Sequence, residues 1–157
     1  MALSQTQVSQ LYVSIFGRAS EGEGNTFWQQ GADMISTATE MLATPQAVAY
    51  FGDTLTDNQA FIEHIYLNTL GKTYADDPDG IDYWTGRLDA GESQGTIIAD
   101  LIAAAQAPEN AGDAQDQFNN KVAISNYTAD NIENVTTLST FAGFIDEVDH
   151  TQASVTD

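Results

Sequence analysis

An internal repeat constrains the fold of this chain more than any other feature of its sequence. The segment from Leu11 to Trp28 matches the segment from Ile65 to Trp84 when two residues are inserted in the second copy. The aligned positions pair Tyr12 with Tyr66, Phe16 with Leu70, Gly17 with Gly71, Arg18 with Lys72, Glu21 with Asp77, Glu23 with Asp79, Gly24 with Gly80, Phe27 with Tyr83 and Trp28 with Trp84. Each copy continues into an apolar segment and then a proline. We therefore expect two similar units, about 4–52 and 57–110.

Each copy has the residue order of a helix, a loop and an aromatic helix. A glycine that ends a helix supplies the left-handed conformation found there, and the cation that follows it is favoured by the helix dipole. The acidic residues of the loop then precede the next helix, whose amides favour anions. The pairs Phe27-Trp28 and Tyr83-Trp84 are expected to pack this corner, with both tryptophans in the core.

Apolar residues recur with the period of an α-helix through most of the chain. The pattern starts between Val8 and Phe16, after a capping box formed by Ser4 and Gln7. No stretch alternates strictly between apolar and polar residues as a strand does. The sequence predicts an all-α protein of about eight to ten short helices.

Three further helix starts can be placed from the sequence. The pattern from Thr37 to Glu40 is that of a capping box before an apolar helix, and Ser93 is placed as the cap of another. Residues 116–127 also fit a helix, although Val122 to Ile124 is the nearest candidate for a strand.

The C-terminal third lies outside the repeat. We expect residues 111–149 to form helices that pack on the two-repeat domain 1–110, including one through Leu138 and Val148. Residues 150–157 are polar and are expected to be a frayed tail.

The charge of the chain excludes several partners. Four Lys and Arg against 23 Asp and Glu give a formal charge of −19. Binding to nucleic acid, or to an anionic membrane surface, requires clustered basic residues. No run approaches the ~20 apolar residues of a membrane span, so neither nucleic-acid binding nor direct bilayer insertion is expected.

The sequence contains few of the residue patterns that are typical of enzyme active sites. The chain has no cysteine, and His64 and His150 are too far apart in the sequence for a helical metal motif. There is no phosphate-binding glycine loop and no serine nucleophile elbow. Paired carboxylates could serve a glycosidase, but nothing isolates such a pair among the 23 acids. We expect a protein that is not an enzyme.

The loop of the second copy is the candidate calcium site. Hard oxygen ligands at this density are what calcium requires, and the four carboxylates are Asp76, Asp77, Asp79 and Asp82. Aligning Gly80 with the invariant glycine of a helix-loop-helix calcium loop puts Ala75 and Gly86 at two ligand positions, which is a poor match. The alternative is that these acids cap helices and form a solvated surface.

The repeated pattern of tyrosine, Gly-Arg/Lys, acidic Gly loop and aromatic-Trp resembles a bacterial domain family of unassigned function that is often attached to haemolysin-type calcium repeats. Between Ser4 and Tyr127 the chain is similar to the N-terminal region of Gram-negative surface-layer (S-layer) proteins. That resemblance implies an anchor on the outer cell surface, exported by a type I route and bound to lipopolysaccharide, commonly with a divalent cation. The start of the sequence lacks the features of a secretory signal, which agrees with that route.

Sugar recognition uses planar hydrogen-bonding groups beside an aromatic face. Around the two loops, the candidate residues are Arg18, Asn25, Lys72, Tyr74, Asp77 and Arg87. The alternative role of Arg18 and Lys72 is to cap helices. A protein of charge −19 is repelled by phosphate-bearing lipid unless calcium bridges the two or the target is a neutral polysaccharide.

Two functions of different classes are compatible with these features of the sequence. The first is a non-enzymatic module that tethers a surface-layer or secreted protein to lipopolysaccharide or another surface polysaccharide. The second is a self-associating structural module of a surface array or biofilm matrix.

Overall fold

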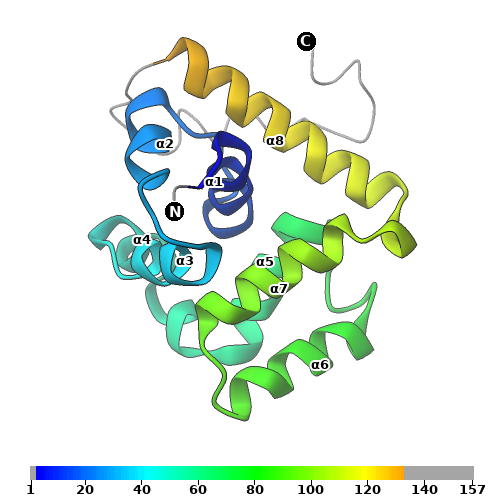
Figure 1. The fold of residues 1–157 in the computed structure, drawn as a ribbon. Coiled ribbons are helices and arrows are strands. Elements are labelled where there is room, and N and C mark those ends of the chain that lie inside the picture. The colour runs from blue at the N-terminus through cyan, green and yellow to red at the C-terminus, as the bar shows by residue number, and fades with distance from the viewer. Residues whose placement is uncertain (1–2, 133–157) are drawn as a thin grey trace.

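The computed structural model describes residues 3–132, and this part of the chain is all-helical with no strand (Figure 1). The α-helices are α1 (Gln5–Leu11), α2 (Gly22–Trp28), α3 (Met34–Leu42), α4 (Pro45–Phe51), α5 (Asn58–Leu70), α6 (Pro78–Asp89), α7 (Gln94–Gln106) and α8 (Asp113–Asn131). A π-helical segment η1 (Tyr12–Phe16) and the 3₁₀ segments η2 (Gly52–Thr56) and η3 (Pro108–Asn110) complete it. The prediction of an all-α fold is confirmed.

Local capping sets several of the helix boundaries. In α1 the predicted capping box is present, because the amide of Gln7 donates to Ser4 Oγ at 3.1 Å and the amide of Ser4 donates to Gln7 Oε1 at 2.9 Å. Ser93 caps α7 by accepting from the amide of Thr96 at 3.1 Å. These ends follow from residues within one turn of the cap, which is why the sequence predicts them.

The start of α3 differs from the prediction. The helix begins one turn earlier than the capping box expected at Thr37, and its N-cap is Asp33, whose carboxylate accepts from the amide of Ser36 at 2.7 Å. Thr37 is buried inside the helix. Aspartate is among the preferred N-cap residues, so the helix begins at Asp33 and Thr37 falls inside it.

The helix predicted over 116–127 is present and longer, since α8 runs from Asp113 to Asn131. Val122 is therefore helical and packs in the core. The expected helix through Leu138 and Val148 and the expected tail 150–157 lie outside the described residues.

The core is centred on α5, which packs against α6, α7, α8 and η1. Phe61 and Ile65 of α5 and Phe118 of α8 are almost completely buried. Burying a side chain of this size contributes roughly 1.5–3 kcal/mol. The helices α3 and α7, which occupy corresponding places in the two repeats, pack on each other (Figure 1).

Glycines end the first helix of each repeat as predicted. Gly17 has φ +61° and Gly71 has φ +68°, and each amide donates to a carbonyl four residues earlier. The left-handed conformation turns the chain into the loop that carries the candidate site residues. Among residues 3–132, no helix combines the length and apolarity that a membrane crossing demands.

Candidate functional site

Each repeat forms a corner in which a tyrosine of the first helix meets a carboxylate at the start of the next. The Tyr12 hydroxyl lies 3.5 Å from Glu21 Oε1, and the Tyr66 hydroxyl donates to Asp77 Oδ2. Both pairs are the ones aligned by the sequence repeat. The repeat alignment therefore corresponds to the same contact in both corners.

A glycine makes this contact possible in each corner. A Cβ atom on Gly24 would lie 1.9 Å from Glu21 Oε1, and one on Gly80 would lie 2.3 Å from Asp77 Oδ2. The tyrosine hydroxyl is also within 2.4 Å of that position in both cases. Neither glycine has a positive φ, so both are needed for space rather than for backbone conformation.

The aromatic pair of each corner is arranged edge to face. The ring centroids of Phe27 and Trp28 are 5.0 Å apart at 84°, and those of Tyr83 and Trp84 are 5.3 Å apart at 82°. Both tryptophans pack against the core as predicted. Phe27 and Tyr83 do not join them, because 58% and 61% of their surfaces are exposed.

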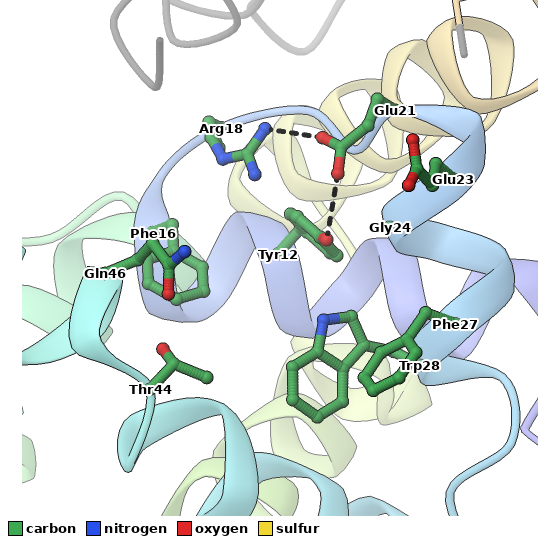
Figure 2. A pocket seen from close by; sticks show the side chains of 10 residues that line it. All are labelled: Tyr12, Phe16, Arg18, Glu21, Glu23, Gly24, Phe27, Trp28, Thr44 and Gln46. Carbon is green, nitrogen blue, oxygen red and sulfur yellow. Dashed lines mark hydrogen bonds and ion pairs between the residues drawn. The ribbon is translucent and has the colours of Figure 1, made fainter. Parts of the chain in front are cut away.

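In the first corner, Arg18 is folded inward (Figure 2). Its Nη1 donates to Glu21 Oε2 at 3.0 Å and to the Ala19 carbonyl at 3.0 Å, and its guanidinium lies 4.8 Å from the centroid of the Tyr12 ring. Only 8% of the side chain is exposed. Arg18 therefore holds Glu21 in place.

This environment changes the acidity of Tyr12. Burial raises the pKa of its hydroxyl well above the usual range, and the negative charge of Glu21 adds to the rise while Arg18 opposes it. Tyr12 consequently stays a neutral hydrogen-bond donor at any physiological pH.

A pocket of about 400 Å³ opens beside this ion pair, between α2 and the start of α4. Figure 2 shows the side chains around it, with Glu21 directed at both Arg18 and Tyr12. The residues that line it are Tyr12, Phe16, Arg18, Glu21, Glu23, Gly24, Phe27, Trp28, Thr44 and Gln46. Aromatic rings thus face a small number of hydrogen-bonding groups, an arrangement typical of small-ligand sites.

The second corner uses its acid differently. Asp77 is the N-cap of α6 and accepts from the amide of Gly80 at 3.0 Å as well as from Tyr66. These hydrogen bonds, with that of Tyr66 the larger effect, lower the pKa of the Asp77 carboxyl. Lys72 is exposed and lines a separate hollow of about 470 Å³ beside the start of α8.

One predicted sugar-binding residue, Asn25, is placed where it cannot contact a ligand. Only 1% of Asn25 is exposed, because its Nδ2 donates to Ser20 Oγ at 2.9 Å and its Oδ1 accepts from Gln29 at 2.7 Å. The repeat carried a signal for this placement, since Asn25 aligns with the fully buried Ile81.

Two other predicted residues stand apart from the pocket. The Arg87 guanidinium forms ion pairs with Glu92 at 2.7 Å and Asp100 at 2.6 Å and lies 4.9 Å from the centroid of the Trp84 ring. Tyr74 is exposed and donates to Asp82 at 3.3 Å. Of the six predicted sugar-binding residues, the structure places only Arg18 in the first-repeat pocket.

The four predicted calcium ligands each have a local position in the second corner. Within residues 3–132, no three acidic or histidine side chains are close enough to share a metal ion. Asp76 accepts from the amide and hydroxyl of Thr73 at 2.9 and 3.0 Å, Asp77 caps α6, and Asp82 accepts from Tyr74. Asp79 lies in the first turn of α6. Local hydrogen bonds account for Asp76 and Asp77, and calcium binding by the four carboxylates stays a prediction.

Apart from Arg18, the sequence analysis named none of the pocket's lining residues as a ligand contact, and those it missed include Glu23, Phe27, Thr44 and Gln46. Glu23 and Phe27 occur in the repeat and could have been inferred as surface residues from their spacing on one helix. Thr44 accepts from the amide of Ala47 at 3.2 Å and so begins α4, which forms the opposite wall. No local pattern connects that wall with α2.

Comparison with known proteins gives one match. Residues 38–113 match the model of a family described as Domain of unknown function (DUF4214). This segment begins within α3 and ends at the start of α8, so it includes the second corner and the Thr44 side of the pocket but not α2. No curated protein and no solved structure shows significant similarity to the chain.

Proposed function

We propose that this chain is a non-enzymatic, carbohydrate-binding module that tethers a bacterial surface-layer or secreted protein to the polysaccharide of lipopolysaccharide. The observation that carries the proposal is the pocket of the first repeat. Exposed Phe27 offers an aromatic face, and Glu23, Thr44 and Gln46 offer hydrogen-bonding groups around it. Apolar sugar faces stack on such rings while hydroxyls bond to such side chains.

The size and rigidity of the pocket support this function. Its volume of about 400 Å³ falls in the range of small-ligand sites. The Arg18–Glu21 ion pair and the packed ring of Trp28 hold one wall in place before any ligand arrives. Preformed sites lose little conformational entropy on binding.

Net charge favours the outer polysaccharide over the lipid core as the target. At −19 the protein is repelled by phosphate groups. Direct recognition of sugar rings avoids the phosphates altogether. The proposal places the chain on the outer cell surface after type I export, as its resemblance to surface-layer anchoring regions implies.

The experiment is a calorimetric titration of purified lipopolysaccharide into the full chain, once intact and once stripped of its outer polysaccharide, with calcium and then with chelator. The proposal expects binding to the intact form only, and persistence of that binding in chelator. Equal binding of the stripped form, or no binding of either form, would contradict it.

Self-association is the second candidate function, and one observation favours it. Large apolar side chains, including Tyr83 and Tyr127, lie exposed on α6 and α8. Light scattering over a range of protein concentrations separates the two functions, because a sugar-binding anchor stays monomeric with or without calcium. A mass that rises with concentration, without lipopolysaccharide binding, supports the array function instead.

A further inference from the structure

The pocket of the first repeat contains one cation, and that cation is already engaged. Arg18 is the only basic residue among those that line the pocket, and its Nη1 donates to Glu21 and to a backbone carbonyl. Its guanidinium also covers the ring of Tyr12. An anionic ligand would have to compete with Glu21 for this group at the cost of leaving a largely buried carboxylate unpaired.

A second carboxylate stands at the rim of the same pocket. Glu23 is exposed, and it lies four residues before Phe27 on α2, so both side chains project from one face of the helix. A group bound against the exposed ring of Phe27 is therefore within reach of the Glu23 carboxylate.

The lining of the pocket consequently has a formal charge of −1, from one arginine and two glutamates. This negative charge favours a cationic ligand. The aromatic rings of the lining favour one as well, because the faces of Phe and Trp attract cations. The surrounding protein, at −19, strengthens the negative potential.

We infer that this pocket selects sugars that carry a protonated amino group over N-acetylated and acidic sugars. The inference rests on the proposed carbohydrate-binding function and names its ligand class. The ammonium group is placed at the rim, against the Phe27 ring and beside Glu23, with the sugar ring in the pocket between α2 and α4.

The test uses three methyl glycosides, of glucosamine, N-acetylglucosamine and glucuronic acid, titrated separately into the ¹⁵N-labelled chain at a mildly acidic pH where the amine is protonated. The indole N–H signal of Trp28 reports on the pocket. We expect glucosamine to bind about fivefold more tightly than N-acetylglucosamine, and glucuronic acid to bind most weakly.

Glu23→Gln should remove this preference, because it should weaken the binding of glucosamine by more than it weakens the binding of N-acetylglucosamine. Glu109→Gln makes the same charge change at an exposed site that does not line the pocket, and it should preserve the preference. Equal binding of the two amino sugars, or an unaltered preference in Glu23→Gln, overturns the inference while the binding function stands. If none of the three sugars shifts the Trp28 signal, the binding function fails along with the inference.

Discussion

The two corners share a plan but differ in what their carboxylates do. Asp77 is short enough to cap α6 while it accepts from Tyr66, whereas Glu21 stands at the N-cap of α2 without capping it and reaches Arg18 instead. Aspartate is a preferred N-cap residue and the longer glutamate is not. The two acids differ by one methylene group, and the shorter one caps its helix while the longer one pairs with Arg18 at the pocket.

The cations of the two corners also differ, because one is buried at the pocket and the other is exposed. Arg18 bonds Glu21 and a backbone carbonyl while it lies over a ring, and a planar guanidinium is suited to all three contacts. Lys72, at the aligned position, stays exposed. The two corners therefore have a similar helix-loop-helix arrangement, but only the first has a buried arginine–glutamate ion pair beside its pocket.

The largest difference between the corners should appear when each cation is removed. We expect Arg18→Ala to lower the free energy of unfolding by about 3 kcal/mol, because it leaves Glu21 largely buried without its ion pair. Lys72→Ala should change it by less than about 0.5 kcal/mol, since the side chain is exposed. Urea denaturation measures both values, and equal losses would show that the corners are not different in this respect.

Substitution of the paired glycines should reveal what the corners have in common. Gly24→Ala and Gly80→Ala should each destabilise the protein by about 1–3 kcal/mol, because the new methyl group collides with the tyrosine–carboxylate pair. Gly86→Ala is the control on α6, where nothing lies within 4 Å. It should raise stability by up to about 1 kcal/mol through helix propensity. Thermal unfolding of the three variants provides the comparison, and stable Gly24 and Gly80 variants would refute the shared contact.

The smallest expected effect is the loss of stability at acid pH that comes from Asp77 in the second corner. Hydrogen bonds from Tyr66 and Gly80 hold the pKa of Asp77 below its usual value of about 3.9. The stabilisation is complete above the pKa of the unfolded chain and is lost as pH falls through the lower pKa of the folded state.

Asp77→Asn keeps an N-cap acceptor but does not titrate. The difference in unfolding free energy between the unsubstituted protein and this variant should therefore shrink on going from pH 7 to about pH 3. Urea denaturation at both pH values measures it. A difference that is constant with pH would show that Asp77 does not gain stability from its ionised form.

Local chemistry explains which parts of this fold could be predicted from the sequence. The capping box of Ser4 and the helix ends at Gly17 and Gly71 depend on residues within a turn or two, and all three were predicted correctly. The start of α3 was misplaced because two cap-like residues compete there and Asp33 wins.

The site was harder to predict because it depends on contacts between distant segments. Asn25 was expected at the surface, but Ser9 of α1, Ser20 and Ser125 of α8 form a buried hydroxyl cluster beside it, and Ser20 Oγ lies 2.7 Å from Ser125 Oγ. Those partners are 105 positions apart. Charge and aromatic content mark the corners as candidate sites, whereas the tertiary packing decides which corner gathers its tyrosine, carboxylate and aromatic pair around one pocket.

The measurement that tests the central claim most directly is lipopolysaccharide binding by Phe27→Ala beside its matched control Tyr83→Ala. Both aromatic residues are mostly exposed and stand edge to face on a tryptophan, so both variants should fold. We predict that Phe27→Ala weakens binding about tenfold, the loss expected for removing a stacking ring, and that Tyr83→Ala leaves it unchanged. Equal losses in the two variants, or a loss only in Tyr83→Ala, would contradict a sugar site in the first repeat.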